Sequence, residues 1–360
     1  MWQAKALRAP EDPAIGALRL RIREDATPIR LIGSAGGARS GLKRFEQFSF
    51  VAGILLLGWL VYRIGPGNLA SNLVEVGWGF LLILALYAIT VLLNSLSWQK
   101  MLGADARVPL RELAPMLVAG DAITTVNPIG LVGGSLVRVS LLSRALAPRT
   151  ALISVGLASM TQFVGQVLFV LSGVPVALAM IREERLRLGL RVFCAGLSIF
   201  LGLVLLVGFS SGVQRRIGTR LARIHWLVAR WESVPDRWRS LVGASLAALR
   251  ERPGSFVLSV AASWLAWQTG VVGTFVTLRL LHQPVSWGEA LAIEVLGVAI
   301  EGALFFVPGK MGTQEGGKVL IFLAMGLPPA KGFALGFLRR LRELAWALPG
   351  LAILGNSRRR

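Results

Sequence analysis

The sequence predicts an all-α polytopic membrane protein, with about six spanning helices and two re-entrant helical hairpins arranged as an inverted-topology repeat. Of the 360 residues, 54% are hydrophobic and 16% are charged, whereas about a quarter of the residues in soluble domains are charged. The apolar residues form runs of roughly the 20 residues that cross a bilayer. Two of these runs are interrupted by proline and paired glycines.

The basic residues lie between the apolar runs, which explains most of the net charge of +20. This distribution follows the positive-inside rule, so it favours an anionic membrane leaflet, and not nucleic acid, as the partner. Residues 1–44 lack the apolar region of a signal peptide and are predicted to form a basic cytoplasmic tail. With one cysteine and two histidines, we expect no disulfide within the chain, no metal site and no cofactor.

A first transmembrane half is expected at 45–210. The sequences 113–126 and 135–146 are each too short to cross a bilayer alone, and they flank the sequence GLVGG. Backbone that is not helical is tolerated at membrane depth only inside protein or beside a water-filled cavity. We therefore predict a re-entrant hairpin near 113–146 that enters from the cytoplasm. The spanning helices of this half are expected at 48–62, 80–98, 150–174 and 192–209.

A basic amphipathic segment is expected at 211–252 on the cytoplasmic side. Between Gln214 and Arg252 it has nine arginines against three acidic residues, and its apolar residues recur every three or four positions. This pattern is typical of a helix that lies in the membrane surface. Two roles remain open: a tether whose arginines reach out to water, or a segment that gathers anionic lipid headgroups at Gln214 to Arg252.

The second transmembrane half is expected at 253–354, with a basic tail at 355–360. Its spanning helices are predicted at 256–280 and 330–354, and a second re-entrant hairpin is predicted near 289–325, entering from outside. This topology leaves both termini in the cytoplasm and puts most of the positive charge there. Each hairpin has the same order of apolar helix, proline, paired glycines, short helix, proline and long helix.

Opposed hairpins of this kind occur in transporters that bind substrate near the midplane with discontinuous helices. The alternative is that the prolines and glycines only kink packed helices, because both residues are common in membrane helices. The residues expected to form the two loops are Pro128, Gly133, Gly134, Pro308, Gly309, Gly312, Gly316 and Gly317.

Charged residues gather beside the second break and halfway along the last helix. An ionised residue at the centre of a membrane helix costs roughly 2.5 to 3.5 kcal/mol, so these residues must face a polar interior or pair with acids. The expected substrate-binding residues are Asn127, Arg138, Gln162, Lys310, Gln314, Lys318, Arg339, Arg340 and Arg342. Those expected to balance charge or carry protons are Asp121, Glu294, Glu301, Glu315 and Glu343. The alternative is a buried ion network that only fixes helix packing.

Gly312 to Lys318 reads GTQEGGK and so matches the start of a phosphate-binding loop, but Val319 replaces the serine or threonine that would bind magnesium. We therefore do not expect ATP binding. A nucleophile, a base and a group that orients the base are not found together in the sequence, so we do not expect an enzyme.

The sequences NPIGLVGGSLVRVSLL and FFVPGKMGTQEGGKVLIFLAMGLPPAKGFALGFLRRLRE resemble the transmembrane, flippase-like domain of the lysylphosphatidylglycerol synthase family over about residues 48–354. This resemblance, which includes members without a catalytic domain, implies lipid translocation by an integral protein of the bacterial inner membrane. Because the chain ends soon after its last helix, synthase activity is not expected. QEGG at 314–317 with RRLRE at 339–343 is most similar to the branch associated with hopanoid synthesis.

The predicted function is a lipid flippase that moves an anionic or isoprenoid-type lipid through a polar cavity at the midplane, without ATP. One alternative is a scaffold that does not transport, or a lipid-binding partner of a lipid-biosynthetic enzyme. Another is a proton-coupled transporter of small solutes. The lipid, the direction of transport, the coupling ion and the formation of a homo-oligomer stay open.

Overall fold

The computed structural model describes residues 62, 67, 74–103, 106, 108–126, 130–181, 183–210, 236–303 and 312–357. All the regular elements in these ranges are α-helices, so the predicted all-α class is confirmed. They are α4 (Gly79–Lys100), α5 (Leu110–Val126), α6 (Gly130–Leu142), α7 (Pro148–Met180), α8 (Glu184–Phe209), α11 (Asp236–Glu251), α12 (Pro253–Leu280), α13 (Trp287–Ala303), α14 (Thr313–Met325) and α15 (Pro329–Ser357).

Four of the described helices, α4, α7, α8 and α12, are long and apolar enough to cross a membrane. Together they confirm a polytopic membrane protein. Helix α15 has 29 residues, which corresponds to about 44 Å at 1.5 Å per residue, but it carries charges along its middle. The spanning helix predicted at 48–62 lies almost wholly outside the described residues.

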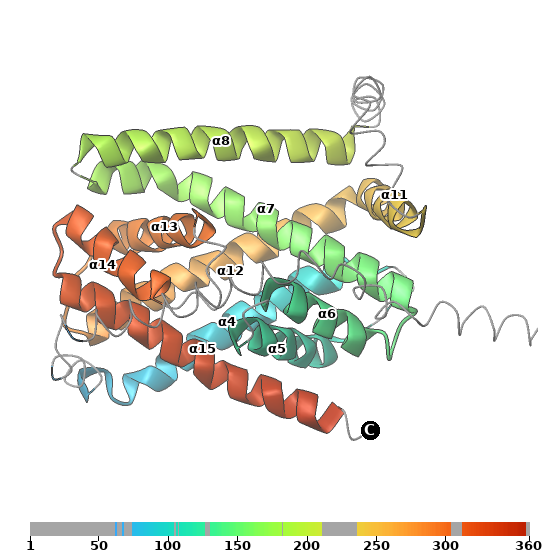
Figure 1. The fold of residues 1–360 in the computed structure, drawn as a ribbon, viewed down its shortest axis with the longest axis horizontal. Coiled ribbons are helices and arrows are strands. Elements are labelled where there is room, and N and C mark those ends of the chain that lie inside the picture. The colour runs from blue at the N-terminus through green and yellow to red at the C-terminus, as the bar shows by residue number, and fades with distance from the viewer. Residues whose placement is uncertain are drawn as a thin grey trace, which may run out of the picture. The chain divides into compact units, whose positions relative to one another are not determined.

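Each of two helical hairpins packs against a long helix of the other half of the chain (Figure 1). Helix α5 packs on α6, its hairpin partner, and on α15 of the other half. Likewise α13 packs on its partner α14 and on α7 of the other half. Helices α7 and α15 run in opposite directions in Figure 1, and so do α4 and α12, which lie side by side.

Two spanning helices extend beyond their predicted limits. Helix α7 continues through Pro175 to Met180, because neighbouring membrane helices can satisfy the backbone groups that a proline leaves unpaired. Helix α8 begins at Glu184, inside the stretch expected to be a loop. Glu184 is ion-paired with Arg187 at 3.0 Å and with Arg191 at 3.5 Å. The first of these pairs is three positions apart, a spacing that stabilises a helix.

The paired glycines do not form turns, which corrects the sequence prediction. Gly133 and Gly134 lie within α6, while Gly316 and Gly317 lie within α14. A Cβ atom on Gly134 would collide with the Thr124 side chain and the Gly120 carbonyl oxygen on α5. Gly134 therefore serves close helix packing, as small residues commonly do in membranes, and a Cβ atom on Gly317 would likewise lie 3.2 Å from the Ile300 side chain.

Gly312 does have a loop conformation. It precedes α14 with φ of 73°, in the left-handed region that favours glycine. The other expected loop and site residues in the two breaks, namely Asn127, Pro128, Pro308, Gly309 and Lys310, lie outside the described residues. In the basic segment, only α11 and its neighbours are described, and α11 packs on α7, α8 and α12.

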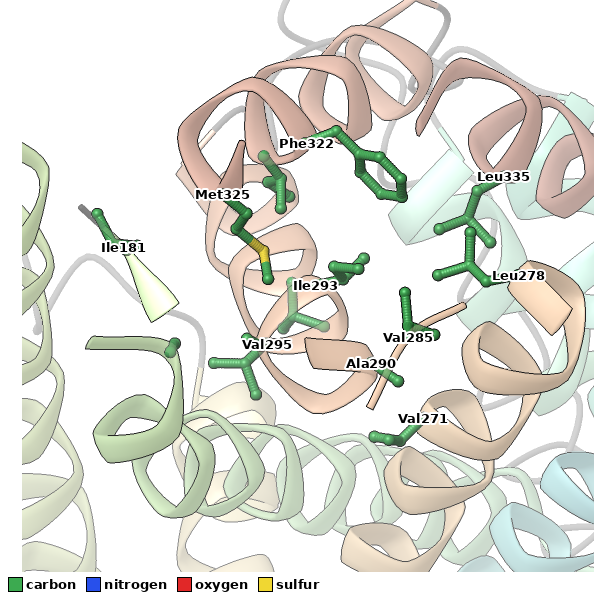
Figure 2. Packing of buried hydrophobic residues seen from close by; sticks show 14 of the residues in the cluster. Ile181, Val271, Leu278, Val285, Ala290, Ile293, Val295, Phe322, Met325 and Leu335 are labelled. Atoms are coloured by element: carbon green, nitrogen blue, oxygen red, sulfur yellow. The ribbon is translucent and has the colours of Figure 1, made fainter. Parts of the chain in front are cut away.

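Apolar side chains fill the space between α12, α13, α14 and α15 (Figure 2). Phe322 and Met325 of α14 point toward Ile293 of α13 and Leu335 of α15, and all four are buried. In a bilayer such contacts stabilise through close packing, since lipid tails are as apolar as these side chains. The charged residues described next lie on α13, α14 and α15 as well.

Hydroxyl groups join α4, α7 and α12. The Ser97 hydroxyl lies 2.8 Å from the hydroxyls of both Ser259 and Ser263, and Ser259 also donates a hydrogen bond to Thr161 at 2.8 Å. All four residues are buried. Hydroxyl hydrogen bonds between helices hold membrane helices together in this way.

Candidate functional site

Glu294 is the centre of a buried ion network between α12, α13, α14 and α15. Its carboxylate accepts hydrogen bonds from Arg339 Nη1 at 2.6 Å, Thr274 Oγ1 at 2.8 Å and Lys318 Nζ at 3.3 Å. The Glu294 side chain is 2% exposed. Three donors from three helices converge on one carboxylate, which compensates for its removal from water.

Lys318 reaches Glu294 across the α13–α14 hairpin. Its ammonium also donates to the carbonyl oxygen of Ile293 at 3.1 Å, and its side chain is 1% exposed. Gly297 lies directly against the end of the lysine, where a Cβ atom would collide with it. The glycine therefore makes room for a buried lysine inside the hairpin.

Arg339 on α15 lies among three carboxylates. Besides Glu294, it is ion-paired with Glu301 at 3.9 Å and with Glu343 at 3.7 Å. Glu294 and Glu301 are seven positions apart, which is two helical turns, so both face α15 from one side of α13. Arg339 thus joins α13 to α15.

Helices α14 and α15 are joined by two polar contacts. Arg340 Nε lies 3.4 Å from Glu315 Oε1, and Gln314 donates a hydrogen bond to Glu343 Oε1 at 3.1 Å. Gly336 permits this approach, because a Cβ atom there would lie 2.9 Å from the Glu315 Cα atom. One oxygen of Glu315, Oε2, is buried without a hydrogen-bond partner.

Arg342 of α15 contacts Tyr87 of α4. Its guanidinium carbon lies 4.6 Å from the centre of the Tyr87 ring, a cation–π contact. Within the described part of the chain, no carboxylate lies at ion-pair distance from Arg342, and its Nε is buried without a hydrogen-bond partner. Tyr87 also contacts Trp346, with ring centres 5.6 Å apart.

The first hairpin has a separate ion pair. Arg138 on α6 donates to Asp121 on α5 at 2.5 Å, and Gly120 leaves space for the arginine side chain. Asp121 lines a small cavity of about 20 Å³ together with Tyr87, Glu343 and Trp346. This cavity is the place where the first hairpin meets the charged part of α15.

The structure therefore brings together most, but not all, of the residues predicted for the site. Arg138 lies in the other hairpin, and Gln162 is partly buried on α7 without taking part in the network. The residues that join the network are Lys318, Arg339, Arg340, Gln314, Glu294, Glu301, Glu315 and Glu343.

Two important residues were not predicted. Thr274 donates to Glu294 from α12, and Tyr87 holds Arg342 from α4. Tyr87 is one of only two tyrosines in the sequence, and a rare aromatic hydroxyl inside an apolar run was the available signal. Threonine is common in membrane helices, so Thr274 gave no distinctive signal.

The charges of the described cluster balance. Lys318, Arg339 and Arg340 of the network and Arg342, which lies beside it against Tyr87, supply four positive charges, and Glu294, Glu301, Glu315 and Glu343 supply four negative charges. Removing one member would leave a partner charged and unpaired away from water, which is costly. An anionic group can therefore bind Lys318, Arg339 or Arg340, whose partners are carboxylates, only if it takes the place of one of those carboxylates.

A family model described as "Lysylphosphatidylglycerol synthase TM region" matches residues 47–350. The match covers both hairpins, the ion network and all four apolar spanning helices. No curated protein and no solved structure matches the chain. Among the described residues, no group of three or more His, Cys, Asp or Glu side chains could hold a metal ion.

Proposed function

The chain belongs to the lysylphosphatidylglycerol synthase transmembrane family, and we propose that it moves a polar lipid between the leaflets of a bacterial inner membrane. The observation that carries this proposal is the buried ion network of α13, α14 and α15. A lipid headgroup cannot cross hydrocarbon without polar partners, and ionised residues at membrane depth typically mark a substrate pathway.

The headgroup binds by exchange with a carboxylate. Glu315 is the carboxylate to be displaced, because its Oε2 has no hydrogen-bond partner, whereas Glu294 is held by three donors. Arg340 would then bind the phosphate of the lipid, because arginine binds phosphate through paired hydrogen bonds. Glu294, Lys318 and Arg339 remain as the fixed part of the site.

The two halves, α4–α7 and α12–α15, are copies with inverted topology. This part of the proposal is supported by the packing, because each hairpin contacts the long helix of the other half. It is also supported by the opposite directions of α7 and α15 (Figure 1). Transporters with this plan alternate access by moving one repeat against the other around a fixed site.

Both termini lie in the cytoplasm under this arrangement, and the chain works as a transporter without enzymatic activity. The transported lipid is anionic or of the isoprenoid type, in keeping with a hopanoid-associated branch. Charge balance in the network favours one rival function, a membrane scaffold or lipid-binding partner that does not transport. In that case the ion pairs would only hold the helices together.

Variants of the Glu315–Arg340 ion pair distinguish a lipid transporter from a scaffold that does not transport. The variants are Arg340→Gln, the double variant Glu315→Arg with Arg340→Glu, and Arg187→Gln as control, which removes an ion pair outside the network. Each is reconstituted in vesicles that contain labelled phosphatidylglycerol or a labelled polyprenyl phosphate, and movement of the label between leaflets is measured.

We expect wild type and Arg187→Gln to move the lipid, and Arg340→Gln to lose most of the rate. The double variant should restore thermal stability without restoring transport, because the cation has moved to α14. If wild type moves none of the tested lipids, the flippase proposal is wrong. Full recovery of transport in the double variant would show that the pair is only structural.

A further inference from the structure

A second cavity lies where α4 ends and where α7 and α12 begin. Its volume is about 150 Å³, and its lining includes Lys100, Leu102, Thr150, Leu157, Arg252 and Phe256. None of these residues belongs to the ion network. Because α4, α7 and α12 are long enough to span the membrane, their ends lie at the boundary between membrane and water.

We propose that this cavity binds the headgroup of a membrane lipid whose net charge is −1, carried by its phosphodiester group. Its lining includes two cations, Lys100 and Arg252, and one acid, Glu251. The charge of the lining is therefore +1, which a monoanionic phosphodiester neutralises. A headgroup with a second negative charge would be repelled by Glu251.

Arg252 is held in position for this role. Its Nη1 donates to the carbonyl oxygen of Leu102 at 3.3 Å, which fixes the guanidinium against the end of α4. An arginine side chain has five N–H donors, so others remain for a ligand. Lys100, on the last turn of α4, adds a second positive charge from another helix.

Two helix N-termini add to the attraction for an anion. Helix α7 begins at Pro148 and α12 begins at Pro253, and no side chain caps either end. The amide groups of an uncapped first turn carry partial positive charge and bind anions. Thr150 in the first turn of α7 lines the cavity itself.

Apart from Ser154, the side chains in the rest of the lining are apolar, which favours a lipid over a soluble anion. Leu102, Leu157, Leu249 and Phe256 are between 2% and 6% exposed. The cavity volume is about 150 Å³, whereas a cavity of roughly 10 to 15 Å³ on this measure already holds one water molecule. A phosphate group with its glycerol ester fits this space, while the acyl chains extend into the bilayer.

This site is independent of the proposed translocation. It holds a lipid of one leaflet at the end of the bundle, beside α11, whose residues Ala248 and Leu249 also line the cavity. A bound lipid would tie α11 to α4, α7 and α12. Loss of transport in a network variant should therefore leave binding at this cavity unchanged.

Native mass spectrometry of the detergent-purified full chain tests the proposal. The chain is mixed with dioleoylphosphatidylglycerol, with dioleoylphosphatidylcholine, or with sodium phosphate, and the bound mass is measured. The first test variant is Lys100→Gln with Arg252→Gln. The second, Thr150→Trp, fills the cavity without changing charge. The control, Arg144→Gln with Arg149→Gln, removes two cations near α7 that do not line the cavity.

We expect wild type and the control to retain phosphatidylglycerol. The variant Lys100→Gln with Arg252→Gln should bind it about tenfold more weakly, as the loss of charge-assisted hydrogen bonds implies, and Thr150→Trp should weaken binding similarly because the indole occupies the cavity. Phosphatidylcholine and phosphate should bind weakly throughout. Unchanged retention of phosphatidylglycerol in both test variants would overturn the proposal. Tight binding of phosphate to wild type that displaces phosphatidylglycerol would also overturn it, because the site would then serve a soluble anion.

Discussion

Glu315 of α14 and Arg340 of α15 are ion-paired at 3.4 Å although the glutamate side chain is completely buried. The arginine is only 14% exposed, so both charges are largely removed from water. A pair in such surroundings contributes little net stability, yet removing one partner strands the other charge. The behaviour of single and double variants at these positions follows from this difference.

Arg340→Met alone should destabilise the protein by about 3 to 5 kcal/mol, because Glu315 is left buried and unpaired. The double variant Glu315→Leu with Arg340→Met should be clearly more stable than Arg340→Met. Unfolding in mixed micelles, followed by circular dichroism, measures both free energies. A double variant less stable than the single one would contradict this account of the pair.

Gly336→Leu should separate α14 from α15. A Cβ atom at this position already lies 2.9 Å from the Glu315 Cα atom, and backbone cannot move aside as a flexible side chain can. We expect a large loss of thermal stability, measured by scanning fluorimetry. The control is Gly202→Leu on α8, where a Cβ atom meets nothing within 4 Å, and it should unfold close to the wild-type temperature.

The contact between Arg342 and Tyr87 should couple α15 to α4. In a double-mutant cycle with Arg342→Met and Tyr87→Leu, we expect a coupling free energy of about 2 kcal/mol, the size of a cation–π contact away from water. The unfolding free energies of the two single variants and the double variant give this value. Additive effects of the two changes would show that the 4.6 Å contact contributes nothing.

Ser259→Ala should weaken the hydroxyl cluster of α4, α7 and α12. Ser259 donates to Thr161 at 2.8 Å and lies 2.8 Å from the Ser97 hydroxyl. Hydrogen bonds between membrane helices are worth about 0.6 kcal/mol on average, so we expect a loss of roughly 1 kcal/mol in the unfolding free energy. Ser245→Ala serves as control, because Ser245 bonds within its own helix. An equal loss in both variants would show that contacts between helices are not responsible.

Much of the helical plan was predictable because membrane helices require long apolar runs. The same requirement made the charged residues informative, since each must find a partner. The seven-residue spacing of Glu294 and Glu301 indicated one helix face, and the structure joins both to Arg339. Spacing along one helix is a local property, which a sequence displays directly.

Contacts between distant helices were not predictable in the same way. Paired glycines are compatible with a turn and with close packing, and only the neighbouring helix decides between them. At Gly134 the deciding neighbours are Gly120 and Thr124 on α5. Tyr87 and Arg342 belong to helices far apart in the sequence, so no local pattern could predict their contact.

The equal numbers of positive and negative groups in the cluster have an electrical consequence. Moving one elementary charge through the full membrane potential involves about 2.3 kcal/mol per 100 mV. When the transporter changes conformation without a bound lipid, the charged residues of the cluster would move together with no net charge. The membrane voltage would then do no work on that step. If the chain transports an anionic lipid as proposed, the voltage would act on the step that carries the lipid and would favour net flux in one direction.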